Sequence, residues 1–209
     1  MNIVEAYKVW SEQYDSNENK TRDLESVSLR ETLGSIEFAK VLEIGCGTGK
    51  NTVWLAEHAK AILAVDLTPE MLEIAKSKVN ATHVNFQIGD ITQNWDFAKD
   101  PYDLAVFSLV LEHIENLDLV FEKLAQVINK DGFVYIGELH PFKQYAGSKA
   151  RFNTSDGEQV VTCFNHHVSD FTEAAKKHGF EIKLIKEYFD DEDKKNLPRI
   201  LTILFKKLA

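Results

Sequence analysis

The stretch VLEIGCGTGKNT, residues 41–52, decides how this chain is expected to fold. Its first four residues form a short apolar run, which indicates a buried parallel strand. Glycines follow at Gly45, Gly47 and Gly49, and residues 50–58 have the composition of a helix. Glycines in such a turn let the backbone approach a ligand, and the start of the helix presents free N–H groups. The stretch therefore predicts a ligand-binding turn between a strand and a helix.

Apolar runs and helical patterns alternate along the rest of the chain. Further strands are expected at residues 62–66, 84–88, 102–109, 133–139, 180–188 and 200–205. Helices are expected from a Thr68 cap to about Val79, over 117–128, and from a Ser169 cap to Gly179. Strands and helices in alternation require right-handed crossovers, so the pattern predicts an α/β fold with a doubly wound, Rossmann-like sheet.

Two stretches interrupt this alternation. Residues 2–33 are mostly helical in composition, with a polar break over 15–20, and precede the first strand. Residues 140–168 replace a short connection; a turn at Ser155, Asp156 and Gly157 and a β-prone run at 160–164 predict a small hairpin there. Since no linker or repeat separates these parts, we expect one domain over 1–209. Its expected parts are an N-terminal helical lid (1–37), a cofactor-binding core (38–139), a substrate-side insertion (140–168), and a last helix with C-terminal strands (169–209).

The composition narrows the class of protein. The 209 residues include 24 Lys and Arg against 33 Asp and Glu, a net charge of −9, which argues against a surface for nucleic acid. No apolar run reaches the roughly 18 residues that a membrane span needs, and the N-terminus does not have the pattern of a signal peptide. Two cysteines, Cys46 and Cys163, make no disulfide framework. We therefore expect a cytoplasmic protein without a membrane partner.

The acid at the end of the second expected strand points to a nucleoside. Asp66 follows Gly45 by 21 residues, where a carboxylate can accept both hydroxyls of a ribose. A dinucleotide fingerprint would read G-x-G-x-x-G, whereas the third glycine here comes one place early. The pyrophosphate interpretation is thereby weakened, but Asp66 by itself does not separate the two cofactor classes.

Four motifs in order resemble one enzyme family. VLEIGCGTGKNT (41–52), AVDLTPEML (64–72), GDIT (89–92) and YDLAVFSLVLEHI (102–114) together resemble the class I S-adenosylmethionine-dependent methyltransferases of the small-molecule "type 11" kind. The resemblance implies a seven-stranded mixed sheet whose last strand is antiparallel. It also implies S-adenosylmethionine as the cofactor and a small molecule as the methyl acceptor. Residues 130–132 depart from the family's frequent Pro-Gly-Gly, at a turn away from the cofactor.

The resemblance also implies roles for particular residues. Turn residues Gly45, Gly47 and Gly49 would lie under the methionine part of the cofactor, with Glu43 near its ammonium group. Nucleoside contacts would come from Asp66 on the ribose, Leu67 on the adenine face, and Asp90 and Ile91 on the adenine edge. Ser108 and Leu109 would lie beside the sulfonium.

The N-terminal segment would contribute a lid. Tyr7, Trp10 and Tyr14 recur on one helix face, and Tyr14 is expected to close over the cofactor, although core packing of this face is the competing interpretation. Arg22 is expected to pair with the carboxylate of the cofactor, since one cation is needed there.

Methyl transfer from a sulfonium is an in-line displacement, so the enzyme mainly aligns the acceptor and excludes water. If the acceptor is a hydroxyl or a carbon acid, it also needs a general base. The candidate bases are His140, directly after the fifth strand, and His113, after the fourth. For each of them a structural role is the competing interpretation. His166 or His167 could also face the site.

Several questions stay open at this stage. A non-catalytic cofactor-binding module and, less favoured, a nicotinamide-dependent oxidoreductase are the alternative functions. The chain shows no metal-ligand spacing, so no metal is expected. A monomer or a homodimer would fit. The net charge of −9 favours an uncharged or cationic acceptor.

Overall fold

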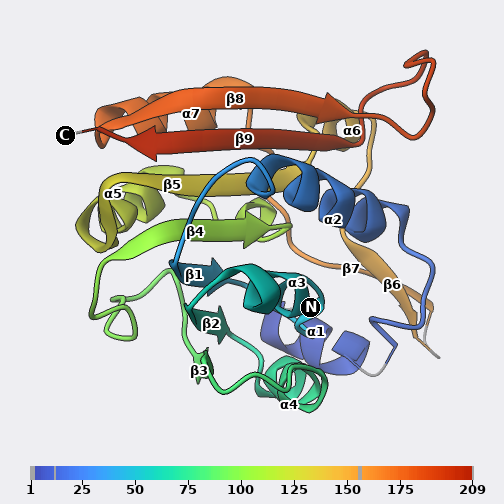
Figure 1. Ribbon diagram of the computed structural model, residues 1–209. Helices are drawn as coiled ribbons and strands as arrows, with labels where there is room; N and C mark the ends of the chain where they lie inside the picture. Colours follow the sequence, from blue (N-terminus) through green and yellow to red (C-terminus); the bar gives the residue numbers. More distant parts are fainter. Residues whose placement is uncertain (1–2, 12, 155–156, 209) are drawn as a thin grey trace.

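A single seven-stranded sheet forms the centre of the protein (Figure 1). The structure is a computed structural model that describes residues 3–11, 13–154 and 157–208. The strand order is β3-β2-β1-β4-β5-β9-β8. The strands are β1 (Lys40–Ile44), β2 (Ala61–Asp66), β3 (Val84–Ile88), β4 (Tyr102–Ser108), β5 (Ile128–Leu139), β8 (Phe180–Tyr188) and β9 (Ile200–Lys207).

The sheet is mixed, as the resemblance implied. Strands β1 to β5 pair in parallel, and β9 inserts between β5 and β8, antiparallel to both. The β5–β9 ladder runs from Phe133 opposite Lys206 to Leu139 opposite Ile200. The order of the sheet reverses between β1 and β4, so the turns after these two strands meet at one edge. In such sheets a ligand crevice lies at this point.

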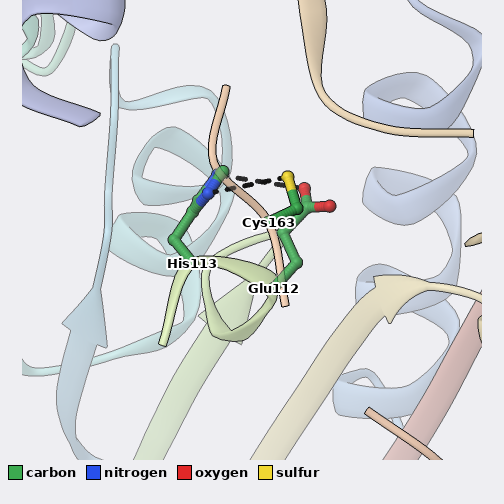
Figure 2. Close-up of side chains that lie close together, drawn as sticks. All are labelled: Glu112, His113 and Cys163. Atoms are coloured by element: carbon green, nitrogen blue, oxygen red, sulfur yellow. Dashed lines mark hydrogen bonds and ion pairs between the residues drawn. The ribbon is translucent and has the colours of Figure 1, made fainter. Parts of the chain in front are cut away.

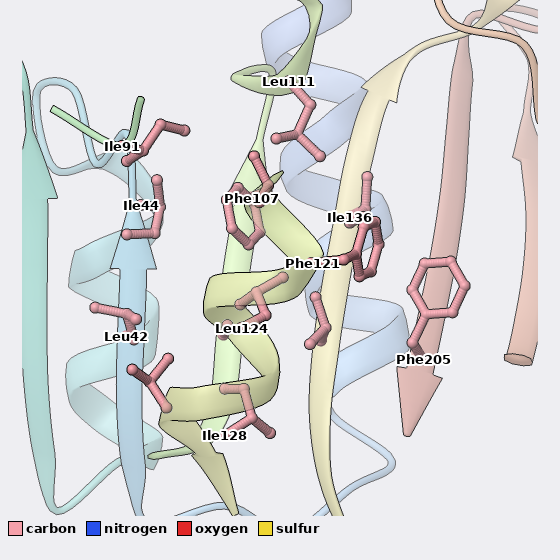
Figure 3. Close-up of a cluster of buried hydrophobic side chains, with 14 of the residues drawn as sticks. Leu42, Ile44, Ile91, Phe107, Leu111, Phe121, Leu124, Ile128, Ile136 and Phe205 are labelled. Atoms are coloured by element: carbon pink, nitrogen blue, oxygen red, sulfur yellow. The ribbon is translucent and has the colours of Figure 1, made fainter. Parts of the chain in front are cut away.

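Helices cover both faces of the sheet. They are α1 (Ile3–Ser11), α2 (Lys20–Leu33), α3 (Lys50–His58), α4 (Pro69–Lys78), α5 (Leu117–Val127), α6 (Pro141–Tyr145) and α7 (Val168–Lys177), with a short 3-10 turn η1 (Leu111–His113). On one face, Phe121 and Leu124 of α5 pack with Phe107, Ile136 and Phe205 of the sheet (Figure 3). The other face is covered by α2 and α3.

Two element boundaries differ from the sequence-based expectation. Helix α5 ends at Val127, and Ile128 already belongs to β5, five residues before the expected strand. Ile128 pairs with Tyr102, and this pairing with β4 extends β5 backwards at the expense of the helix. Helix α7 is preceded by His167 rather than Ser169, because the Asp170 carboxylate accepts the His167 backbone N–H at 2.7 Å.

The insertion after β5 contains the expected hairpin in a shifted register. Its strands are β6 (Arg151–Thr154) and β7 (Gly157–Val160), so the expected strand at 160–164 is wrong beyond its first residue. Val161 instead is buried and packs with Ala6 and Trp10 of α1, a contact that the local sequence pattern does not predict. Ser155 and Asp156 lie outside the described residues.

The lengths of the helices show whether any of them could span a membrane. None of the helices in the described ranges is long and apolar enough to span a bilayer.

Candidate active site

The glycine turn forms the floor of the site. Gly45, Gly47 and Gly49 have φ angles of 69°, 53° and 80°, a region that favours glycine. Gly45 has a second constraint, because an added Cβ would lie 2.3 Å from a methyl carbon of Val110. The Gly45 N–H donates to the Val65 carbonyl at 2.8 Å, which ties the turn after β1 to the end of β2.

Asp66 is bound to this turn. One carboxylate oxygen accepts the Gly47 N–H at 2.8 Å, and the other accepts the Thr68 N–H at 2.9 Å. Burial raises the pKa of Asp66, and these backbone hydrogen bonds oppose the increase. The two bonds orient the carboxylate at the mouth of the turn.

A cavity of about 320 Å³ lies above the turn. Most of the predicted nucleoside contacts line it: Gly45, Gly47, Asp66, Leu67, Asp90, Ile91, Ser108 and Leu109, together with Tyr7, Tyr14 and His113. Asp90 is oriented by its own turn, since its carboxylate accepts the Thr92 N–H at 2.8 Å and the Thr92 hydroxyl at 2.6 Å. Gly49 does not line this cavity; it packs against Ala75 of α4 at the start of α3.

A smaller cavity of about 50 Å³ adjoins the glycine turn and contains charged groups. Glu43 is 3% exposed, and burial raises its pKa to about 8, although the Thr52 hydroxyl donates to it at 2.6 Å. Glu25 of α2 lines the same cavity and accepts from the Ser108 hydroxyl at 2.7 Å. Sequence reasoning missed Glu25. The one local feature that could have predicted its burial is its position one helical turn before Leu29, which is buried.

Arg22 also lines the small cavity, but most of its donors already have partners. Its guanidinium donates to the backbone carbonyls of Tyr14 and Asn17 and forms an ion pair with Asp23. It also lies 5.7 Å from the centre of the Tyr14 ring. Arg22 therefore fixes the segment between α1 and α2 and stands beside the cavity at the same time.

A third cavity, of about 430 Å³, lies on the other side of Leu109 and Tyr14. Helix α1, the segment after it, and the insertion form its walls; they contribute Tyr7, Trp10, Tyr14, Glu18, Asn19, Lys20, Thr21, Leu109, Glu112, Leu139, Lys149, Ala150, Arg151 and Arg199. Tyr14 and Leu109 line all three cavities. Leu109 has a φ of 58°, which is uncommon for a residue with a side chain and is typical of functional sites.

Glu112, His113 and Cys163 lie together where the two larger cavities meet (Figure 2). The His113 Nδ1 donates to the Thr162 carbonyl at 2.9 Å, so we assign Nε2 as the acceptor for the Tyr7 hydroxyl at 2.8 Å. A ring nitrogen, a thiol and a carboxylate oxygen of the three residues lie within 4.8 Å of one another, close enough to share a cation, but both ring nitrogens already have these partners. Burial raises the pKa of Cys163 to about 12, which keeps it a thiol.

The other predicted histidine, His140, has a different position. Its side chain is 1% exposed, its Nε2 contacts Glu187 at 2.9 Å, and its Nδ1 accepts the Phe142 N–H at 3.1 Å as the cap of α6. It lines none of the three cavities, so the geometry gives no support to an acceptor contact. His166 is likewise engaged, with its Nε2 on the Ile114 carbonyl at 2.7 Å.

Comparison with known proteins adds independent findings. A family model described as a methyltransferase domain matches residues 42–136. An uncharacterized methyltransferase of Emericella nidulans is 28% identical over 86% of this chain and 76% of its own length. A malonyl-[acyl-carrier protein] O-methyltransferase of Priestia megaterium is 30% identical over 71% of this chain and 60% of its own length.

A solved structure extends the likeness to the whole fold. The N-methyltransferase NodS of Bradyrhizobium japonicum, in complex with S-adenosyl-L-homocysteine, superposes with a TM-score of 0.74 at 17% identity and covers 100% of both chains. At 17% identity this superposition shows a shared fold and nothing more specific. The family model matches the segment that builds the glycine turn and most of the 320 Å³ cavity, so this part of the chain is similar to the methyltransferase domain family.

Proposed function

We propose that this protein transfers the methyl group of S-adenosylmethionine to a small-molecule acceptor by in-line displacement. The observation that carries the proposal is the meeting of three cavities at Leu109 and Tyr14. In this arrangement the 320 Å³ cavity would take the nucleoside, the 50 Å³ cavity the amino-acid end, and the 430 Å³ cavity the acceptor. In S-adenosylmethionine the sulfonium links the nucleoside to the amino-acid end. It would therefore lie near Leu109 and Tyr14, where its methyl group would face the 430 Å³ cavity.

The residues present fit this cofactor. Asp66 would hold the ribose hydroxyls and Leu67 the adenine face, with Asp90 and Ile91 at the adenine edge. A carboxylate that accepts two hydroxyls is the usual device for a ribose in this kind of crevice. When bound, the cofactor supplies an electrophilic methyl group, and the chain's own groups position it.

The small cavity is suited to the amino-acid end. Glu43 and Glu25 are buried acids that an ammonium group would compensate. Arg22 and Lys50 line the same cavity and both pair with Asp23, so a cofactor carboxylate would share these cations with that acid. Burial raises the pKa of both acids; hydrogen bonds from Ser108, Asn51 and Tyr135 and the charge of Lys50 oppose the increase at Glu25, and the Thr52 hydroxyl opposes it at Glu43. An unpaired buried carboxylate is costly, so a cationic group in this cavity would lower that cost.

His113 is the candidate for handling the acceptor's proton. Its Nδ1–H is held by the Thr162 carbonyl, which leaves Nε2 to accept a proton through the Tyr7 hydroxyl. Tyr7 lines both larger cavities, so its hydroxyl group stands between the histidine and an acceptor. Burial raises the pKa of Tyr7, so this group keeps its own proton unless another replaces it. For a nitrogen or sulfur acceptor, positioning alone would suffice.

Binding and turnover test the proposal separately. Isothermal titration calorimetry should show that S-adenosylmethionine and S-adenosylhomocysteine bind, whereas NAD does not; binding of NAD alone would favour the oxidoreductase alternative. A screen of metabolites for release of S-adenosylhomocysteine then decides between an enzyme and a binding module. Cofactor binding without turnover of any acceptor would favour the module.

A further inference from the structure

A buried acid lies on the acceptor side of the site. Glu112 belongs to η1, three residues after Leu109, and lines the 430 Å³ cavity. Its side chain is 7% exposed. Within the part of the chain that the structure describes, its Oε2 has no hydrogen-bond partner, and its Oε1 lies 3.9 Å from the His113 Nε2, too far for a hydrogen bond. A donor group on a ligand in the cavity would satisfy this carboxylate.

The neighbours of Glu112 do not neutralise it. Burial raises its pKa, and the charge of His113, the Cys163 thiol and Gln144 oppose this increase (Figure 2). Both ring nitrogens of His113 already have the partners described above, and neither the thiol nor the amide satisfies Oε2. The raised pKa also makes the carboxylate a better proton acceptor than an exposed glutamate would be.

The basic residues of the same cavity differ from Glu112 in their exposure. Lys20, Lys149 and Arg151 are exposed, so their charged ends lie at the rim, in contact with solvent. Arg151 donates to two backbone carbonyls of its own segment, and Arg199 is held in an ion pair. Water and salt screen exposed charges, whereas a buried charge is screened much less. The buried part of the cavity is therefore governed by the acid.

Aromatic rings line the cavity together with this acid. The rings of Tyr7 and Trp10 stack with centroids 5.5 Å apart, and Trp10 lies edge-on to Tyr14 at 5.1 Å. Aromatic side chains offer apolar surface, and their faces attract cations. A ligand with an apolar body and a nitrogen that carries positive charge would match both the rings and the carboxylate of Glu112.

Nitrogen is an acceptor atom whose chemistry suits this wall. A neutral amine keeps its lone pair while its N–H donates to a carboxylate, whereas a hydroxyl must lose its proton to react. In the transfer, the nitrogen lone pair forms the new N–C bond, and the C–S bond breaks with its electron pair left on sulfur. The nitrogen thereby takes over the positive charge of the sulfonium, and the carboxylate of Glu112 can accept the proton that this nitrogen then loses.

We propose that the methyl acceptor is a primary or secondary amine, whose N–H donates to the carboxylate of Glu112 and whose apolar body packs on Trp10 and Tyr14. This inference rests on the proposed function, since it names the class of acceptor for that site. Glu112 is then the residue that selects an amine over the matching alcohol. Both compounds can donate a hydrogen bond, but only the protonated amine brings a positive charge that compensates the buried carboxylate.

The test compares amines with matched alcohols. Protein saturated with S-adenosylhomocysteine, whose sulfur is neutral, is titrated in a calorimeter with benzylamine and benzyl alcohol, tryptamine and tryptophol, and hexylamine and hexanol. The amine of at least one pair should bind about tenfold or more tightly than its alcohol. The trimethylammonium derivative of that amine carries the charge without an N–H group and should bind about tenfold more weakly than the amine.

Two variants locate the effect. Glu112→Gln should reduce the preference for the amine to within about twofold, because it removes the buried charge and keeps the size of the side chain. Glu122→Gln removes the same charge from an exposed position on α5, outside the three cavities, and should keep the parent's preference. Both variants should bind S-adenosylhomocysteine like the parent. If Glu112→Gln does not fold, the amine, alcohol and trimethylammonium compounds decide the question on the parent protein.

The outcomes separate this inference from the proposed function. Failure to bind S-adenosylhomocysteine or S-adenosylmethionine would overturn the proposed function. Four results with the cofactor bound would overturn the amine acceptor alone: alcohols that bind as tightly as their amines, no amine of the panel bound, a trimethylammonium compound that binds as tightly as its amine, or an unchanged preference in Glu112→Gln.

Discussion

The position of Asp66 in the site could be predicted from the sequence, whereas much of what distinguishes Leu109 could not. Asp66 ends β2 and accepts N–H groups from Gly47 and Thr68, and its place was predictable because a strand end and a glycine turn at a set spacing meet in a parallel sheet. Leu109 was expected only as a wall beside the sulfonium. Its φ of 58° and its place between three cavities depend on the chain's path after β4, where its N–H donates to the Gly137 carbonyl at 2.8 Å.

Replacing Asp66 by asparagine tests the nucleoside site. Asp66→Asn should weaken S-adenosylhomocysteine binding by about tenfold or more, because an amide offers one acceptor where a carboxylate offers two to the ribose hydroxyls. Calorimetry gives the Kd, and Asp96→Asn, an exposed aspartate outside the cavities, is the matched control. Thermal melting distinguishes a binding effect from a structural one. A lower Tm with the Kd of the parent would mean that Asp66 only holds the turn.

At the scale of elements, helix α5 was predictable and its junction with β5 was not. Its apolar face repeats with helical spacing and packs on the sheet as expected (Figure 3). Where α5 ends depends on Ile128 pairing with Tyr102 of β4, a contact distant in sequence. The hairpin shifted for a similar reason, since Val161 packs on α1 instead of extending a strand.

The packing of α5 can be measured through one ring. Phe121 is fully buried, with ring centroids 5.8 Å from Phe180 and 5.5 Å from Phe205. Phe121→Ala should reduce the free energy of unfolding by about 3–5 kcal/mol, through lost burial and the cavity left behind. Urea denaturation measures this change. Leu119→Ala on the same helix, 45% exposed, should stay within about 0.5 kcal/mol of the parent. Equal losses in the two variants would contradict the observed orientation of α5.

At the scale of the whole molecule, net charge predicts little about the site. The chain carries a net charge of −9, yet four basic side chains line the 430 Å³ cavity beside Glu18 and Glu112: Lys20, Lys149, Arg151 and Arg199. The fold also buries acids: burial raises the pKa of Glu43 and of Glu138 to about 8. Glu138 accepts the N–H groups of Val110 and Leu111 at 2.9 and 2.7 Å and so holds the turn after β4.

These buried acids make stability depend on pH. In the unfolded chain both groups lose their protons near 4.5, but in the folded chain only near 8. Between these values the folded state binds more protons, so the free energy of unfolding should fall as pH rises, by at most about 1.4 kcal/mol per pH unit for each group.

Glu138→Gln should flatten this decline, because it removes one of the two titrations, while Glu57→Gln at an exposed position should leave it unchanged. Urea denaturation at about pH 5, 6, 7 and 8 measures the free energy of unfolding across this range for the parent and both variants. A parent protein whose stability rises over this range, or a Glu138→Gln variant with the same slope as the parent, would contradict the buried state of these acids.

The sequence by itself determined the alternating α/β fold, the glycine turn and the acids that end β2 and begin the turn after β3. These features follow from local periodicity, backbone freedom at glycine, and the rule that parallel strands direct their carboxyl ends to one edge. Only the tertiary structure decided that His140 contacts Glu187 and lies outside the three cavities, that Glu25 lies in the small cavity, and that α1 and the insertion line the 430 Å³ cavity. Each of these depends on contacts between segments distant in sequence, which no local pattern encodes.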